Sequence, residues 1–561
     1  MSEDIQIEEA APWFVVFITL AGGWLRVLLL DSKGMWLDET FSVWLSNHSA
    51  AEMLHWVVRI DHHPPLYYLL LNSWTGAYGD SPYYVRLLSV LFGTGTIPVI
   101  YLIGKRMSGV VMGLAAAVFL ALSPFNIYLA QEARMYTLLT FNAAVAMVAL
   151  VRLLTDPRSA SPIGSQFRDY VRAWRLSEPV EPVTEQDNSH LDQTHSQTGW
   201  RAWIFRHRWT AIRTIETDLA WVAFIVFSAA AMLSHNTAVL FPLAVNTFVL
   251  ALMIYQRMNK TGPQPAFQAP SPGNWVKAQI GIFLLWSPWI SPFFRQARSV
   301  YERFWIPEPD GDAVVQVLKS FLNASAPMPA DLDRLVWSLY ILVICLGLVY
   351  FRKRISQFLF LAALFLIPFL GELIVSFSRP VFFDRTLVWT TIPLFLVLAA
   401  GIALLKNRFL IILAVGILGT INLFSVSDYF RFFQKEDWFT AAGYVANFAE
   451  EGDLVLFNSN FVEIPFNYYF ETYEDLYAVQ VEKRGIPADL IDDGILEPEM
   501  TESDVPELIS LLHGQDRVWL VYSHNWYTDP LELIPQTLES NMELLRQRDF
   551  YGGQVQLYGT P

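Results

Sequence analysis

Residues 84–104 read YVRLLSVLFGTGTIPVIYLIG, a run dominated by apolar side chains. A helix needs about 20 such residues to cross the hydrocarbon core of a bilayer, and this run supplies them. The two residues that follow, Lys105 and Arg106, are basic. The run therefore predicts a membrane-spanning helix with positive charge at its C-terminal end.

Ten more apolar blocks share this character. They cover residues 11–30, 109–123, 136–153, 217–234, 236–255, 275–292, 335–351, 357–377, 386–404 and 408–426. The composition agrees, because 53% of the residues are hydrophobic and only 16% are charged, whereas a soluble domain carries about 25% charged residues. We expect a polytopic α-helical membrane protein with about eleven transmembrane helices.

Basic residues collect in the connections on one side of these blocks. Besides Lys105-Arg106 they include Arg257, Lys260, Arg352-Lys353-Arg354, Lys406, Arg408 and the arginines of segment 154–216. Such residues favour the cytoplasmic side of a membrane, so we expect a cytoplasmic N-terminus and a cytoplasmic insert at 154–216. The N-terminal sequence MSEDIQIEEA is acidic, unlike a signal peptide, which predicts that the first block is retained as a span.

Net charge divides the chain into two parts. From Tyr429 to the end there are 24 acidic and 7 basic residues, a balance of −17; the total is −15, so residues 1–428 carry +2. We expect a transmembrane domain at 1–428, with an outer loop at 31–83, and a soluble extracytoplasmic domain at 429–561. Its acidity argues against nucleic acid as a partner, because nucleic acid binds basic surfaces.

The acidic C-terminal part alternates two kinds of pattern. Short apolar runs at 453–457 and 517–522 predict buried strands, and amphipathic runs at 437–448 and 531–546 predict helices. This alternation indicates a small α/β domain.

The outer loop holds two adjacent acids, Asp38 and Glu39, directly after the apolar anchor Trp36-Leu37. A partly desolvated carboxylate at a membrane surface can act as a general base, which makes both residues candidate catalytic groups. The other interpretation is that Asp38 caps a short interfacial helix and Glu39 lies in its first turn. The two interpretations are compatible, because a cap fixes the position of the carboxylate.

The same loop ends with Asp61-His62-His63-Pro64-Pro65. Imidazole and carboxylate groups are ligands for divalent metals, so a metal site built from Asp38, His62, His63 and the later His235 is one hypothesis. Adjacent histidines ligate one ion poorly, however. The alternative is that these histidines bind a phosphate or a sugar hydroxyl.

Three other outward-facing corners carry polar residues. Glu132, Arg134 and Tyr136 flank the start of one span, His235 lies at the end of another, and Arg385 follows Asp384 before a late span. Arginine suits bidentate binding of phosphate, although Arg134 at a span end is also a candidate membrane anchor. A lone histidine such as His235 is most often structural.

Several classes of protein are disfavoured. The one cysteine, Cys345, lies in an apolar run and rules out an intrachain disulfide. The sequence has neither a Walker A motif nor a dinucleotide-binding glycine fingerprint. We find no long internal repeat of the kind that many transporters show.

Four motifs in order resemble the membrane glycosyltransferases of the GT-C fold, across about residues 12–430. They are Trp36-Leu37-Asp38-Glu39, His62-His63-Pro64-Pro65-Leu66-Tyr67-Tyr68, Gln131-Glu132-Ala133-Arg134-Met135-Tyr136 and Asp384-Arg385. The likeness is to the glycosyltransferase family 39-like branch, with the dolichyl-phosphate-mannose protein mannosyltransferases and the bacterial aminoarabinose transferase. The latter carries Glu-Lys where this chain has His62-His63.

The resemblance implies a plasma-membrane enzyme that transfers a hexosyl or pentosyl group from a polyprenyl-phosphate donor to an acceptor on the outer face. Asp38 matches the family's loop acid, which activates the acceptor or helps to hold a divalent metal ion. Direct displacement would invert the anomeric centre. Lipid, glycan or protein could be the acceptor. Two rival hypotheses are a transporter or flippase of lipid-linked sugars and a non-catalytic envelope scaffold; polar residues at mid-membrane would favour the transporter.

Overall fold

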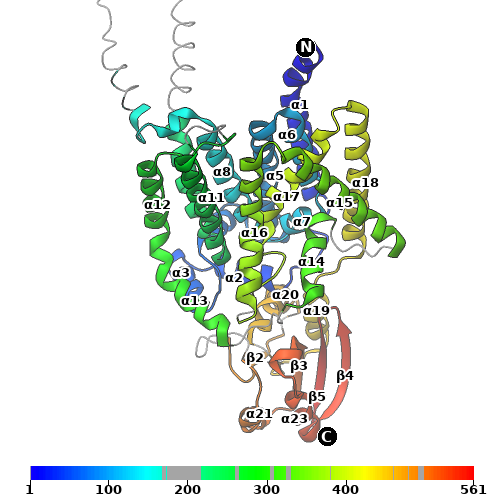
Figure 1. Cartoon of the computed structure of the whole chain (residues 1–561). Helices are drawn as coiled ribbons and strands as arrows, with labels where there is room; N and C mark the ends of the chain where they lie inside the picture. The colour runs from blue at the N-terminus through cyan, green and yellow to red at the C-terminus, as the bar shows by residue number, and fades with distance from the viewer. Residues whose placement is uncertain are drawn as a thin grey trace, which may run out of the picture.

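A computed structural model of the chain describes residues 2–166, 168, 172, 216–259, 265–302, 309–323, 330–378, 381–458, 460–477, 479–490 and 498–560. A bundle of long helices forms one part, and a small sheet with its helices forms the other (Figure 1). The N-terminal end of α1 and the sheet lie at opposite ends of the bundle. Most of the predicted insert at 154–216 lies outside the described residues.

All eleven predicted apolar blocks fall on helices. The longer helices are α1 (Ser2–Val27), α5 (Pro82–Ser108), α8 (Tyr136–Thr155), α11 (Leu240–Met258), α15 (Ala330–Phe351), α16 (Ile355–Ser376) and α18 (Arg408–Phe432). The shorter ones are α6 (Val110–Ala121), α12 (Pro272–Trp286), α17 (Thr391–Leu404) and a helical segment at 216–232. Helix α7 (Pro124–Ala130) follows α6 and lies between two predicted blocks.

Fewer helices qualify as spans than the eleven predicted. Within the described residues, seven helices are long and apolar enough to cross a membrane, or eight if the bent pair α6 and α7 forms one span. Several predicted blocks are short helices: α6 has 12 residues and α17 has 14, fewer than the ~20 that a perpendicular crossing needs.

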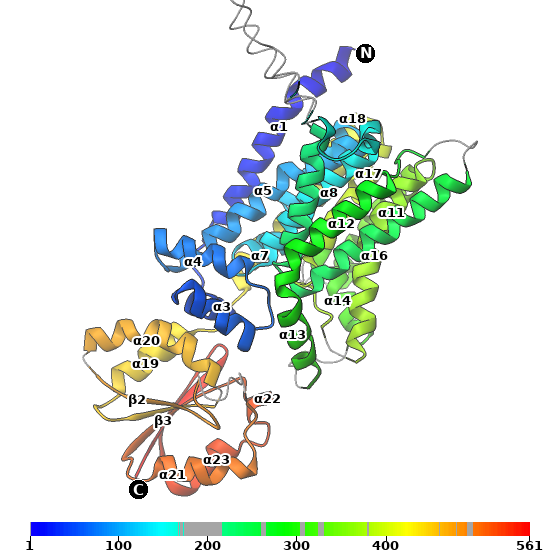
Figure 2. The same cartoon turned by 90° about the vertical axis from the view of Figure 1, so that its left-hand side faces the viewer.

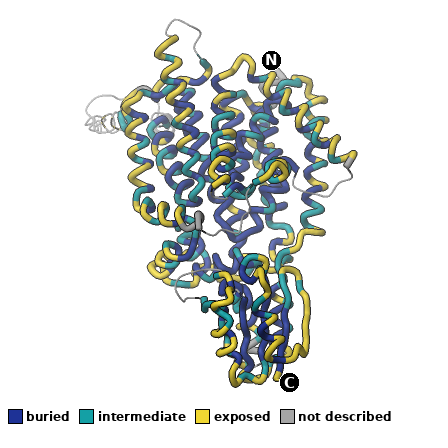
Figure 3. The backbone as a smooth tube through the Cα atoms, turned by 60° about the horizontal axis from the view of Figure 1, so that its bottom comes forward, coloured by how far each residue is buried: buried dark blue, intermediate teal, exposed yellow. Residues whose placement is uncertain are grey.

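Exposed apolar side chains show which surfaces face lipid. Trp13 is 77% exposed on α1, and Phe409 and Ile412 are 71% and 72% exposed on α18. In water such surfaces would be costly, whereas against acyl chains they are not. Buried residues concentrate inside the bundle and the sheet, with exposed residues outside (Figure 3).

Further helices gather at the end of the bundle next to the sheet. They are α2 (Leu37–Ser46), α3 (Ala50–Arg59), α4 (Leu66–Tyr78), α13 (Ile290–Glu302) and α14 (Gly311–Leu322). In Figure 2, α3 and α4 lie between the bundle and α20. Single 3-10 turns complete the chain: η1 (Pro157–Ala160), η2 (Asn236–Val239), η3 (Ser287–Trp289), η4 (Val388–Thr390), η5 (Asn460–Val462) and η6 (Glu502–Asp504).

The C-terminal part contains a five-stranded mixed sheet in the order β2-β1-β3-β5-β4. Its strands are β1 (Leu454–Phe457), β2 (Glu482–Gly485), β3 (Arg517–Ser523), β4 (Glu543–Phe550) and β5 (Gly553–Gly559). Strand β1 is parallel to β2 and β3, and β5 is antiparallel to β3 and β4. The helices are α19 (Trp438–Phe448), α20 (Glu463–Tyr477), α21 (Val505–Leu512), α22 (Asn525–Thr528) and α23 (Leu533–Asn541).

The predicted strands at 453–457 and 517–522 and the helix at 437–448 are confirmed, and the helix at 531–546 is partly wrong. Helix α23 ends at Asn541, and residues 543–550 form the edge strand β4. Seven of the eight residues of β4 are exposed, so the strand lacks the apolar alternation that identifies a half-buried strand. Pairing with β5 determines its conformation.

Candidate active site

Asp38 lies in the first turn of α2, which begins at Leu37 after the N-cap residue Trp36. The predicted capping role of Asp38 is therefore not observed. Its side chain is 31% exposed, and its Oδ2 lies 3.4 Å from Nη1 of Arg385 and 4.0 Å from Nε of Arg134. A partly exposed carboxylate thus stands between two guanidinium groups.

Both arginine side chains are largely buried and make further contacts. The Arg134 side chain is 4% exposed and donates from Nη1 to the backbone carbonyl of Asp38 at 3.3 Å and to the Tyr68 hydroxyl at 3.4 Å. The guanidinium of Arg385 stacks over the Trp36 ring at 4.8 Å. Largely desolvated cations of this kind suit the binding of phosphate oxygens.

Glu39 points away from Asp38 into a buried cluster. Its carboxylate is fully buried and accepts hydrogen bonds from Arg86 (Nε and Nη2, both 2.7 Å), Lys435 (Nζ, 2.8 Å) and the backbone N–H of Ala133 (3.0 Å). Burial raises the pKa of the Glu39 carboxyl, but the charges of Arg86 and Lys435 outweigh burial and hold that pKa at about 2. Glu39 is thus an anchor that carries its negative charge at neutral pH.

Glu132 borders the same cluster. Its side chain is 1% exposed, and its Oε1 lies 3.8 Å from Nζ of Lys435. Burial raises the pKa of the Glu132 carboxyl, and the nearby cations Lys435 and Arg385 reduce that rise.

The histidines form a second group beside Arg134. His63 Nδ1 lies 2.9 Å from Oδ1 of Asp61, and the rings of His63 and His235 are 5.1 Å apart. Burial raises the pKa of the Asp61 carboxyl, but the opposing effect of His63 and Arg134 is larger and brings that pKa to about 2. Burial, His63 and Arg134 lower the pKa of His235 well below its usual value. The charge of Arg134 therefore acts on both groups.

Tyr136 and His62 lie beside the His63–His235 pair. The ring of Tyr136 is 6.1 Å from that of His235. The backbone N–H of His62 donates to Asp61 at 2.7 Å, and its carbonyl accepts from Asn236 at 2.8 Å. The structure thus brings every predicted site residue to one end of the bundle, although Glu39 and Glu132 lie in the buried cluster behind Asp38.

The metal hypothesis receives limited geometric support. Among the described residues, no three His, Cys, Asp or Glu side chains form a group that could hold a metal ion. Nδ1 of His63 is engaged by Asp61, and Nδ1 of His235 by Thr237 at 3.0 Å. His63 and His235 would therefore offer a metal only their Nε2 atoms, and further ligands would be needed to hold it.

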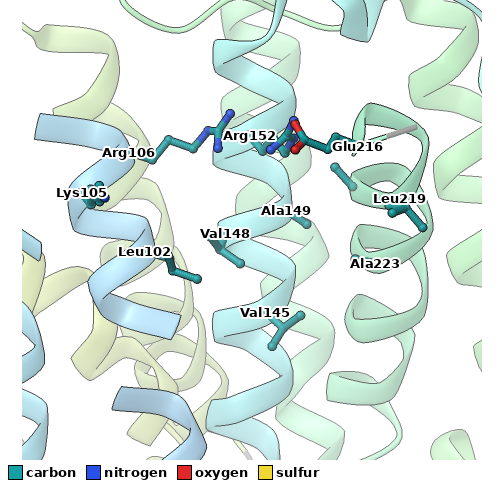
Figure 4. Close-up of a pocket in the computed structure, with 11 residues that line it drawn as sticks. Leu102, Lys105, Arg106, Val145, Val148, Ala149, Arg152, Glu216, Leu219 and Ala223 are labelled. Carbon is teal, nitrogen blue, oxygen red and sulfur yellow. The ribbon is translucent and has the colours of Figure 1, made fainter. Parts of the chain in front are cut away.

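A cavity of about 670 Å³ lies far from this site. It opens between α5, α8 and the helical segment at 216–232, and Lys105, Arg106, Arg152 and Glu216 line one end of it (Figure 4). Arg152 is near the end of α8, whereas Tyr136 begins that helix. Since the helix rises about 1.5 Å per residue, the cavity belongs to the opposite end of the bundle.

Two residues of the buried cluster, Arg86 and Lys435, were not identified from the sequence. Arg86 lies within the apolar run 84–104, where a charged residue needs a buried partner, and that requirement was the available signal. Lys435 follows the last apolar block and is separated from Glu39 by 396 residues, so no local pattern connects the two.

Comparisons with known proteins support the resemblance. Residues 62–163, less than half of the chain, match the family model of dolichyl-phosphate-mannose-protein mannosyltransferase. ArnT from Cupriavidus metallidurans in the apo state aligns with 98% of this chain and 98% of its own, at 12% identity and a TM-score of 0.55. Its structure with bound undecaprenyl phosphate gives a TM-score of 0.52. A search of curated protein sequences finds no match.

The Archaeoglobus fulgidus oligosaccharyltransferase is also similar. Its structure with a tethered acceptor peptide covers 99% of this chain and 74% of its own, at 11% identity and a TM-score of 0.51. Another structure of it contains Zn and sulfate and gives a TM-score of 0.50. At such identities the likeness establishes the fold. The chain is a multi-pass membrane protein with the GT-C fold of these glycosyltransferases, as the sequence predicted.

Proposed function

We propose that this protein transfers a hexosyl or pentosyl group from a polyprenyl-phosphate donor to a hydroxyl of a lipid, glycan or protein acceptor. The observation that carries the proposal is the partly exposed Asp38 carboxylate between the guanidinium groups of Arg134 and Arg385. The ligands of the similar structures, undecaprenyl phosphate and an acceptor peptide, are consistent with it.

The arrangement supplies the two functions that such a transfer requires. Asp38 accepts the proton of the acceptor hydroxyl as that oxygen attacks the anomeric carbon. The bond from that carbon to the phosphate oxygen breaks, and Arg134 and Arg385 stabilise the negative charge that develops on the polyprenyl phosphate. Since phosphate leaves without protonation, one carboxylate suffices, and direct displacement inverts the anomeric centre.

His63 and His235 complete the donor site in this proposal. In this role they would bind the phosphate directly or hold a divalent metal ion, which would add positive charge there. Tyr136 and His62 line this side of the site, and Glu132 lies behind it. Glu39 acts by holding α2 in place, since its carboxylate is fully engaged.

We place the enzyme in the bacterial plasma membrane with Asp38 and the C-terminal sheet outside. The basic residues at the opposite end of the bundle support this orientation, because they favour the cytoplasmic side.

The proposal is tested with purified protein in vesicles that contain a panel of polyprenyl-phosphate sugars, with mass spectrometry of the products. We expect transfer by the native chain and a loss of about 10²–10⁴-fold in kcat for Asp38→Asn, as for removal of a general base. Asp31→Asn, an exposed acid at the start of the same loop, is the control and should retain activity.

Two outcomes would count against the proposal. Full activity of Asp38→Asn would remove Asp38 as the base. Movement of the donor across the vesicle membrane without consumption would instead identify a transporter.

A further inference from the structure

A short linker joins the bundle to the C-terminal sheet, and its side chains contact the loop that bears Asp38. Helix α18 ends at Phe432 and α19 begins at Trp438, so the linker is residues 433–437. Its Lys435 side chain is only 3% exposed. A buried lysine is rare unless it is paired, which indicates a specific role.

Lys435 connects the two segments that carry the site. Its Nζ donates to Oε2 of Glu39 at 2.8 Å and to the backbone carbonyl of Gln131 at 3.4 Å, and it lies 3.8 Å from Glu132. Glu39 belongs to α2 with Asp38, and Gln131 belongs to the turn that carries Arg134. One ammonium group therefore bridges the segments of the base and of the phosphate-binding arginine.

The next linker residue, Glu436, caps helix α2 from outside. The N-cap residue Trp36 offers no side-chain hydrogen bond, and the backbone N–H of Leu37 instead donates to Oε2 of Glu436 at 3.1 Å. A carboxylate at a helix N-terminus is favourable for both hydrogen bonding and charge. Glu436 in turn accepts from Trp438 Nε1 at 2.7 Å and lies 3.2 Å from His524 Nε2.

The C-terminal part adds two contacts to the same loop. The hydroxyl of Tyr469 accepts from the backbone N–H of Met35 at 2.6 Å, and the hydroxyl of Tyr468 donates to the carbonyl of Asp80 at 3.0 Å. The loop is therefore held at its beginning and its end by α20, and at α2 by the linker.

We propose that Lys435 and Glu436 are positioning residues that hold Asp38 in register with Arg134, so that the C-terminal domain is a working part of the active site. This inference rests on the function proposed above. Loss of Lys435 would leave Glu39 and Glu132 buried with fewer cations, and an uncompensated buried charge rearranges its surroundings. The segments of Asp38 and Arg134 would then separate, and a displacement of about 1 Å costs roughly 10²-fold in rate.

The test measures kcat, the KM for a polyprenyl-phosphate sugar and the direct binding of undecaprenyl phosphate for Lys435→Met. We expect kcat to fall by about 10²-fold, while KM and phosphate binding change little, because Arg385 remains in place. Lys435→Arg should recover much of kcat. Arg431→Met removes an exposed cation at the end of α18 and should behave like the native chain.

The pH profile separates positioning from general destabilisation. Lys435→Met removes a cation beside Glu132, whose pKa burial already raises, while Glu39 keeps its ion pair with Arg86. The kcat defect of Lys435→Met should therefore shrink as the pH falls and Glu132 takes up a proton. An unfolded variant would lose activity equally at every pH.

If Lys435→Met does not fold, Glu436→Gln serves as the second variant, because it weakens only the cap on α2. We expect a smaller loss of kcat with unchanged phosphate binding. Unchanged kcat in Lys435→Met, or in Glu436→Gln where that variant replaces it, overturns the inference. Absence of transfer by the native chain and by Arg431→Met would instead contradict the proposed function.

Discussion

In the proposed reaction Asp38 first pairs with the two arginines and then accepts the proton of the acceptor hydroxyl. Before the donor binds, the carboxylate forms ion pairs with Arg385 at 3.4 Å and Arg134 at 4.0 Å. A donor phosphate competes for the same guanidinium groups, because arginine binds phosphate and carboxylate with the same planar fork. Binding of the donor would therefore free the Asp38 carboxylate to receive the acceptor's proton.

Glu39 gives a prediction about stability. Glu39→Gln removes one partner of a buried ion pair with Arg86, so we expect the free energy of unfolding at pH 7 to fall by about 3–5 kcal/mol. The pKa of Glu39 is about 2 in the folded chain and about 4.3 when unfolded. The stabilisation is thus fully present above about pH 4.3 and is lost as the pH falls toward 2.

Unfolding of both proteins in detergent, followed from pH 7 to pH 3, tests this prediction. The difference between them should be constant above about pH 5 and should narrow below it. Glu9→Gln, an exposed acid, is the control. Equal stability of Glu39→Gln and the native chain at pH 7 would contradict the prediction.

The sequence selected candidate residues that lie close together in the structure, but it did not predict their contacts. Asp38, Arg134 and Arg385 were selected because polar groups at the outer ends of apolar blocks are unusual, and the structure brings them together. Arg86 and Lys435 were missed because their roles depend on contacts across 47 and 396 residues. The side chain of Asp38 points toward the site and that of Glu39 points behind it. This difference depends on the helical geometry of α2.

Among the secondary-structure elements, the length of the apolar blocks predicted the helices reliably. It did not predict which helices cross the membrane, because an apolar block can be interrupted by a bend. Helix α6, for example, is followed by α7 at an angle of 57°. Strand β4 was missed because it is an exposed edge whose conformation comes from its neighbour β5. Local periodicity can identify an element only when one face of it is buried.

The packing of α15 against α17 gives a second stability prediction. A Cβ on Gly401 would overlap the backbone carbonyl of Val343, and a Cβ on Gly347 would overlap that of Val397. Small residues let membrane helices approach closely, so Gly401→Ala must push the two helices apart. We expect a loss of about 1–3 kcal/mol, typical of overpacking.

Gly416 in α18 provides the matched control, because nothing lies within 4 Å of a Cβ built there. Gly416→Ala should leave stability unchanged or raise it slightly, since alanine favours helix over glycine. Thermal unfolding of both variants in the same detergent compares them directly. A Gly401→Ala variant as stable as Gly416→Ala would show that the two helices do not pack this closely.

The acidic C-terminal part and the proposed active site lie toward the same end of the protein. The C-terminal part carries −17 and the rest +2, and the sheet lies next to the Asp38 loop, opposite the N-terminal end of α1 (Figure 1). In our proposal the acidic part is held by a few specific contacts, among them those of Lys435, Tyr468 and Tyr469, rather than by a broad basic surface.

The proposed orientation can be tested by labelling, because the chain has a single cysteine, Cys345. In a Cys345→Ser background, Glu539→Cys places a thiol on an exposed position of α23, and Lys353→Cys places one in the exposed connection between α15 and α16. A membrane-impermeant maleimide applied to intact cells should label the first and not the second, because the positive-inside rule assigns Lys353 to the cytoplasm. Permeabilised cells should show labelling of both, which controls for accessibility. The reverse pattern would place Asp38 on the cytoplasmic side, and the donor would then be used on the face opposite to the one proposed.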